Sequence, residues 1–137
     1  MTTDITVRKT DYQVEKRSWL LGPVGTMPGE NPSVTLDLAA FPANRYPNGY
    51  IPSGTVLGKI TATGLYGPYD DTLANGLETA RGLLFSSINV PAATGKVGGA
   101  LFKRGDVDET KLPWSTGKGA LDANARADLK FIDSFAY

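Results

Sequence analysis

Glycine and proline interrupt this chain throughout and so limit the elements that it can form. The 137 residues include 16 glycines and 9 prolines. Such a turn-rich composition favours short strands joined by tight turns over long helices. A chain of this length forms one domain and can bury a core of modest size. We therefore expect a single, mainly β domain.

Several segments carry the patterns of short strands. Ser33 to Leu38 alternates apolar and polar residues, which predicts a half-buried strand. In the segment that begins at Gly54, Val56 faces opposite to Leu57, and Gly58 predicts a bulge or a close backbone approach. Further strands are expected over residues 79–88 and 100–102, with a loop of small residues over 92–99.

One helix is expected, near the C-terminus over Ala120–Ile132. Its apolar residues fall on one face at helical spacing: Leu121, Ala125, Leu129 and Ile132. The fold predicted from these elements is a small β-barrel or β-tulip-like domain of short strands with one C-terminal helix.

The first 33 residues differ from the rest. Charges and scattered apolar residues precede a Gly/Pro-rich stretch over residues 22–32, which cannot form a helix or a central strand. We expect an extended N-terminal arm with its linker over residues 1–33 and a folded domain over residues 34–137. The alternative is that the first residues form an edge strand of the same domain.

Composition excludes several classes of function. The chain has no cysteine and no histidine, so disulfides, the usual zinc sites and Ser-His-Asp or Cys-His nucleophiles are impossible. The formal net charge is zero and gives no indication of nucleic-acid binding. The polar N-terminus predicts no signal peptide, and the apolar runs are too short for a membrane span. We therefore expect no cofactor, metal, small-molecule substrate or membrane partner, and no enzyme.

Three motifs resemble sites and are better explained as turns. The segment 106–110 is acidic, yet it lacks the glycine and the distant glutamate of a calcium loop. Asp70 and Asp71 could serve hydrolysis only if both were held across a cleft. The glycines of 95–99 lack the Lys-Ser/Thr ending and the helix of a phosphate-binding loop.

The arm holds the candidate binding residues. Basic pairs at residues 8–9 and 16–17 lie near Tyr12 and Trp19, a combination that could bind single-stranded nucleic acid, but neighbouring acids dilute the charge. We favour a protein partner, because aromatic and aliphatic anchors concentrate interface energy. The expected anchors are Val7, Tyr12, Val14, Trp19 and Leu20. The alternative is that they cap the chain's own core.

The order of motifs between Ile51 and Pro113 resembles a known family. Gly54-Thr-Val-Leu-Gly58 is followed by Gly64-Leu-Tyr-Gly-Pro-Tyr69, then Asn75-Gly76, then Ala80-Arg-Gly-Leu-Leu84. This pattern is similar to that of the head decoration proteins of tailed bacteriophages, the family of the phage lambda capsid-stabilising protein.

The resemblance implies a function. Members of that family form trimers on the outside of the phage head and clamp the major capsid protein after the shell expands. The N-terminal segment is then expected to reach the shell, and the protein to be made in the bacterial cytoplasm. This chain departs from shorter members in its region 1–32 and in its C-terminal helix.

Two other functions remain open from sequence alone. The chain could be another non-catalytic phage part, such as a tail tube or head–tail connector subunit. A carboxylate-based glycosidase or lyase accessory domain would need paired acids beside aromatic platforms, and the sequence shows no such pairing.

Overall fold

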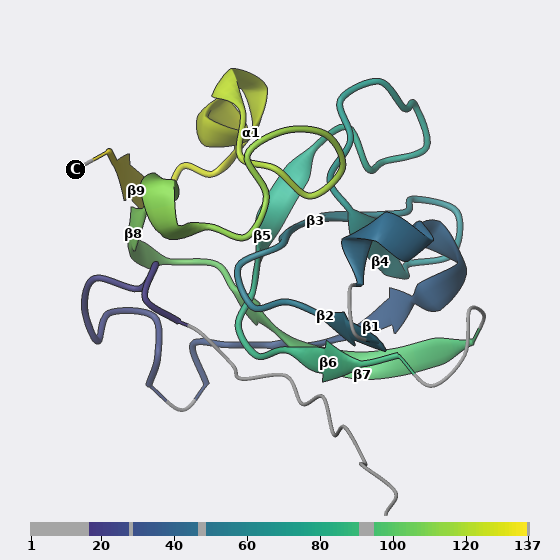
Figure 1. Ribbon diagram of the computed structural model, residues 1–137, viewed down its shortest axis with the longest axis horizontal. Coiled ribbons are helices and arrows are strands. Elements are labelled where there is room, and N and C mark those ends of the chain that lie inside the picture. Colours follow the sequence, from purple (N-terminus) through teal and green to yellow (C-terminus); the bar gives the residue numbers. More distant parts are fainter. Residues whose placement is uncertain (1–16, 28, 47–48, 91–94, 137) are drawn as a thin grey trace, which may run out of the picture.

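The computed structural model describes residues 17–27, 29–46, 49–90 and 95–136. Their main feature is a closed five-stranded barrel (Figure 1). Around the barrel the strands follow the order β1 (Ser33–Asp37), β4 (Tyr66–Pro68), β3 (Val56–Lys59), β5 (Ala80–Leu84) and β7 (Lys96–Phe102). The prediction of a small β-barrel with one C-terminal helix is confirmed.

The barrel closes through one parallel and four antiparallel pairings. β1 pairs parallel with β4 and antiparallel with β7, and β3, β4, β5 and β7 pair antiparallel. The register between β3 and β5 shifts at Gly58, where a Cβ atom would lie only 2.9 Å from Leu77 Cα. Both properties predicted for Gly58, a bulge and a close approach, are confirmed.

Two further pairs of strands flank the barrel. β2 (Tyr50–Ile51) pairs antiparallel with β6 (Ile88–Asn89). β8 (Gly105–Asp108) pairs parallel with β9 (Ile132–Phe135). Single-turn 3-10 helices follow β1 as η1 (Leu38–Ala40), precede β2 as η2 (Ala43–Arg45) and follow β8 as η4 (Glu109–Lys111).

The C-terminal helix is shorter than predicted. α1 spans Ala123–Asp128, and the expected Ala120–Ile132 was too long at both ends. Asp122 caps its start, since Oδ1 accepts a hydrogen bond from Ala125 N at 2.8 Å. Ile132 belongs to β9, where pairing with β8 satisfies the backbone in an extended form.

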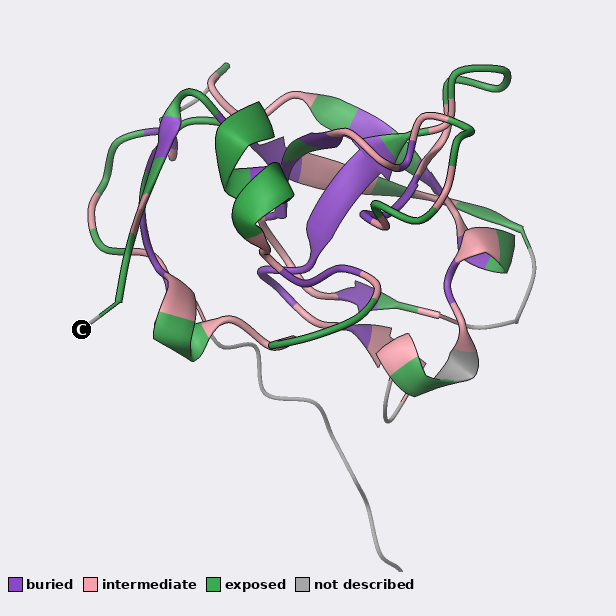
Figure 2. Cartoon of the chain, turned by 90° about the horizontal axis from the view of Figure 1, so that it is seen from above, coloured by how far each residue is buried: buried purple, intermediate pink, exposed green. Residues whose placement is uncertain are grey.

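Two hydrophobic clusters fill the molecule. The barrel cluster draws on four of the five barrel strands and consists of Val34, Leu36, Leu38, Phe41, Ile51, Leu57, Leu84, Ile88 and Leu101. The outer cluster consists of Trp19, Val56, Tyr69, Ala80, Leu83, Phe102, Val107, Ala125, Leu129 and Ile132. Figure 2 shows buried residues running through the middle of the molecule and exposed residues on the outward face of α1.

Three strands form the wall between the clusters. Consecutive residues on β3, β5 and β7 enter opposite clusters, in the pairs Val56/Leu57, Leu83/Leu84 and Leu101/Phe102. Side chains alternate across a strand, so both faces of these strands are buried. The expected opposition of Val56 and Leu57 is confirmed.

Trp19 lies inside the folded domain. Its side chain is 0% exposed, its Nε1 donates to Ser53 Oγ at 3.2 Å, and its ring meets Phe102 edge-to-face at 5.2 Å. Leu20 packs against the same outer cluster and forms a bridge with Val107 of β8. Both residues therefore have the role that the sequence left as the alternative, in the chain's own core, and Trp19 is not accessible to a partner.

Candidate interaction surface

β8 joins the two ends of the described chain. On one side, Asp108 N donates to Trp19 O at 2.7 Å and Leu21 N donates to Asp106 O at 3.2 Å. On the other side β8 pairs with β9. Segments far apart in sequence thus lie side by side at one end of the molecule, where Figure 1 shows β8, β9 and the purple start of the described chain.

Arg17 fixes the point at which residues 1–16 join the domain. Its Nη2 donates to Ser86 Oγ at 3.2 Å, and its guanidinium lies 4.3 Å from the centroid of the Phe85 ring. Phe85 in turn stacks on Phe102 at 6.3 Å. A planar cation over an aromatic face is an attractive geometry, so the base of the arm is held to the outer cluster.

Exposed apolar side chains gather at this same end. All the large hydrophobic residues that are exposed in the described chain come from two short segments: Leu21, Val24, Met27, Phe131 and Phe135. Both segments contact β8, because Leu21 bonds to Asp106 as above and Gly105 N donates to Phe131 O at 3.1 Å. We call these five residues the apolar end.

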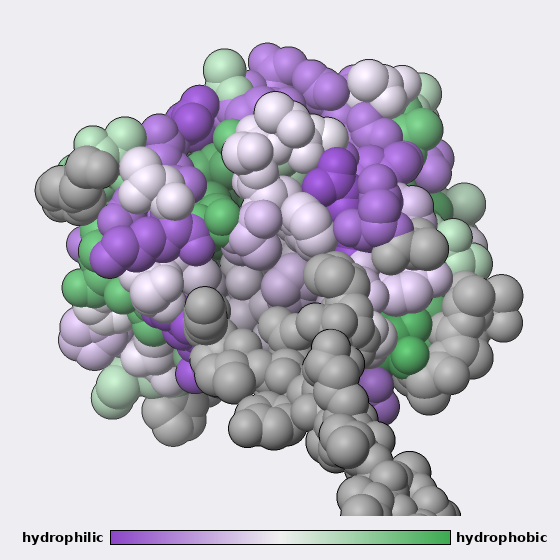
Figure 3. Space-filling view, viewed as in Figure 1, coloured by the Kyte–Doolittle hydropathy of each residue, from purple (hydrophilic) through white to green (hydrophobic). Residues whose placement is uncertain are grey.

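A hollow lies within the apolar end. It measures about 430 Å³ and is lined by Lys103, Arg104 and Phe131. Both cationic residues are exposed, and Phe131 is 75% exposed. Figure 3 shows green hydrophobic atoms interspersed with purple hydrophilic ones over the β8 and β9 end of the molecule. The surface therefore combines apolar contact area with positive charge.

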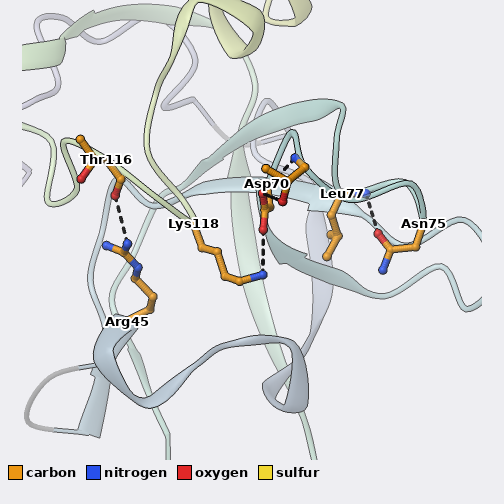
Figure 4. A network of polar contacts seen from close by, with 7 residues as sticks. Arg45, Asp70, Asn75, Leu77, Thr116 and Lys118 are labelled. Atoms are coloured by element: carbon orange, nitrogen blue, oxygen red, sulfur yellow. Dashed lines mark hydrogen bonds and ion pairs between the residues drawn. The ribbon is translucent and has the colours of Figure 1, made fainter.

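A polar network holds a loop elsewhere on the barrel (Figure 4). Lys118 Nζ lies 2.8 Å from Asp70 Oδ2, and Arg45 Nη2 donates to Thr116 O at 3.0 Å. The Arg45 guanidinium also lies 4.6 Å from the centroid of the Trp114 ring. These contacts fasten the loop over residues 114–118 to the barrel.

The acids beside this loop have structural partners. The hydrogen bond from Lys118, followed by that from Thr72, lowers the pKa of Asp70 to about 2. Burial, together with the hydrogen bond that its hydroxyl donates to Asp122, raises the pKa of Tyr69. Asp71 accepts a hydrogen bond from Asn124. A cavity of about 300 Å³ adjoins them, but Asp70 is held as an ion-paired carboxylate and is a poor proton donor.

The remaining predicted motifs are structural in the described residues. The acidic segment 106–110 forms most of β8 and the start of η4, and Asp108 Oδ1 accepts hydrogen bonds from Thr110 N and Oγ1. The loop expected over 92–99 was wrong from Lys96 onward, where β7 begins. Val7, Tyr12 and Val14 lie outside the described residues.

Two searches of the described chain found nothing that points to another kind of site. No cluster of three carboxylates in the described ranges could hold a metal ion. None of the helices described is both long enough and apolar enough to cross a bilayer. The apolar end is therefore the strongest candidate for a functional surface in this part of the chain.

The geometry agrees with a comparison against known protein families. Residues 30–132 match the family of the bacteriophage lambda head decoration protein D. No curated protein matches the chain. The matched region runs from just before β1 to the first residue of β9 and so includes every strand of the barrel. The chain belongs to the head decoration protein family of tailed bacteriophages.

Proposed function

We propose that this protein is a cement protein that binds the outer surface of the expanded phage head and stabilises it by bridging capsid subunits. The observation that carries the proposal is the family match over residues 30–132. The family has a capsid decoration role, which favours this function over that of a tail tube or head–tail connector subunit.

The proposed partners are the major capsid protein and two further copies of this chain in a trimer. The protein is made in the host cytoplasm and resides on the virion surface. It needs no cofactor and binds neither nucleic acid, membrane nor small substrate. The lack of histidine and cysteine supports a non-enzymatic role, since these residues supply most nucleophile and acid–base pairs.

The arm contributes to head binding through residues that precede Arg17. Val7, Tyr12 and Val14 are the proposed anchors, because Trp19 is already buried in the outer cluster. An extended segment gains most by adding a strand to an exposed sheet edge. Ordering it costs about 1–2 kcal/mol per residue, so apolar anchors must add to the backbone hydrogen bonds.

Purified protein mixed with expanded, undecorated heads tests the proposal. Sedimentation should recover the protein with expanded heads and not with unexpanded ones, and decorated heads should resist heating better. Cryo-electron microscopy should then show density at local three-fold positions. Failure to bind expanded heads, or monomers at positions without three-fold relation, would contradict the cement function or the trimer respectively.

Deletion of residues 1–16 tests the arm separately. We expect the shortened protein to fold with an unchanged melting temperature and to bind heads more weakly. A lower melting temperature would show that the deleted residues belong to the core.

A further inference from the structure

The exposed apolar side chains are confined to one end of the molecule. Val24 is 50% exposed, Met27 60% and Phe131 75%, and the described residues expose no large hydrophobic side chain outside the apolar end. Contiguous apolar surface on a soluble protein marks an interaction site, whereas single exposed residues do not. The clustering around β8 therefore calls for a partner.

We propose that the apolar end is the face that docks on the phage head, against a capsid protein surface that presents an apolar side chain bordered by carboxylates. This inference rests on the proposed function and adds the contact surface and the chemistry of its partner. The apolar end then acts beside the arm as a second, independent source of affinity.

The position of the arm favours the head over a second copy as the occupant. The arm joins the domain at Arg17, four positions before Leu21, and Arg17 is held on Phe85 and Ser86. Sixteen residues extend at most about 50 Å, so the surface beside their root lies well within the region that the arm reaches. Whatever shell the arm binds, the apolar end lies next to it.

The hollow specifies the chemistry of the partner. Phe131 supplies an apolar wall, and Lys103 and Arg104 supply two cations around a space of about 430 Å³. An inserted apolar side chain would be desolvated there, and flanking carboxylates would meet both cations. Asp106 and Asp133 are also exposed on β8 and β9, so the surface carries both signs of charge and can fix the orientation of docking.

The apolar end is built on ordered backbone. Gly105 has φ +140°, and a Cβ atom there would lie 2.6 Å from both the Phe102 ring and the Val24 carbonyl oxygen. Gly25, with φ +85°, approaches the Arg104 carbonyl even more closely. Only glycine fits these two positions. Because the surface exists before docking, its contacts carry no large ordering cost.

The test measures binding of the full chain to expanded, undecorated heads. The variants are Val24→Ser, Phe131→Ser and their combination, with Leu73→Ser as the matched control. Leu73 is a half-buried apolar residue in the turn after β4 and belongs to neither hydrophobic cluster. We expect the double variant to raise the dissociation constant about tenfold and the control to change it less than about twofold. Melting temperatures verify that all variants fold.

The results separate this inference from the proposed function. If the wild type does not bind heads, the cement function fails and the inference fails with it. If the wild type binds and the double variant binds equally well, the inference alone is overturned. If sedimentation velocity shows that the double variant loses self-association, the apolar end is an interface between copies, which also overturns the inference.

Charge variants provide a second measurement. Lys103→Gln with Arg104→Gln should weaken head binding about threefold and reduce its dependence on salt, because rim charges contribute modestly and are screened. Unchanged binding and an unchanged salt dependence would contradict the carboxylate-bordered partner.

Discussion

The barrel cluster and the outer cluster share three strands but are assembled differently. The barrel cluster lies within residues 34–101, and neighbouring barrel strands supply most of it. The outer cluster draws residues from 19 to 132 and includes one tryptophan from before the barrel and a helix and strand from after it. The barrel is thus a largely local structure, whereas the outer cluster depends on both ends of the chain.

The two clusters also differ in what surrounds them. Tyr69, Ser53 and Asp122 place hydrogen-bonding groups at the margin of the outer cluster. The apolar end is attached to it through β8 and β9, while the barrel cluster exposes no comparable surface in the described residues. The comparison indicates that the barrel supplies a scaffold and that the outer layer carries the functional surface.

The largest expected effect is that of Trp19→Ala. Removal of a fully buried tryptophan typically costs about 3–5 kcal/mol, and here it also leaves Ser53 Oγ without its donor. Urea denaturation measures the loss in the free energy of unfolding. Trp19→Phe serves as the milder variant if the alanine protein does not fold. A loss below about 1 kcal/mol would show that the outer cluster does not depend on the N-terminal segment.

Leu36→Ala probes the barrel cluster and should cost about 2–5 kcal/mol. Combined with Trp19→Ala, its effect should be additive within about 0.5 kcal/mol, because the two residues belong to different clusters. Trp19 and Phe102 touch, so that pair should deviate from additivity by about 0.5–1.5 kcal/mol. Strong coupling between Trp19 and Leu36 would contradict the separation of the clusters.

Asp70→Asn should have a smaller, pH-dependent effect. Ionisation of Asp70 stabilises the fold above the ordinary carboxyl pKa of 3.8, and this stability is lost as the pH falls to about 2. Lys118 is 37% exposed, so solvent screening reduces the expected contribution to about 1 kcal/mol. Thermal unfolding between pH 6 and pH 2 measures it. The difference between wild type and variant should vanish at the acid end.

Phe131→Ser should change stability least. The side chain is 75% exposed, so its removal should alter the free energy of unfolding by less than about 0.5 kcal/mol. A larger loss would mean that Phe131 belongs to the outer cluster, and the contrast between a buried scaffold and an exposed docking surface would weaken.

Local patterns predicted much of the barrel. Alternation located β1, and the apolar run over 79–88 located β5, although the structure divides that run between β5 and the separate strand β6. Lys96–Gly99 was expected as a loop because small residues carry little strand signal, yet long pairing with β1 makes it part of β7. There, tertiary contacts override local preference.

The outer layer was harder to predict. The stripe containing Ala125, Leu129 and Ile132 correctly indicated burial, but four residues of strand at its end cannot be distinguished from helix by periodicity. No local pattern shows that Trp19 packs near Ser53 and Phe102, since these contacts span the chain. The candidate surface was missed for the same reason: its two segments meet only through β8.

The pairing of β8 with both ends of the chain has a consequence for biosynthesis. The bond from Asp108 N to Trp19 O closes a loop of 89 positions, and β9 must still be added on the other side. Contacts between distant residues form slowly because loop closure precedes any gain from packing. On the ribosome, the tryptophan near the beginning therefore waits, unburied, for nearly the whole polypeptide to emerge. Meanwhile it exposes apolar surface that chaperones recognise, so the docking surface is completed only after release, when a finished protein can meet a finished shell.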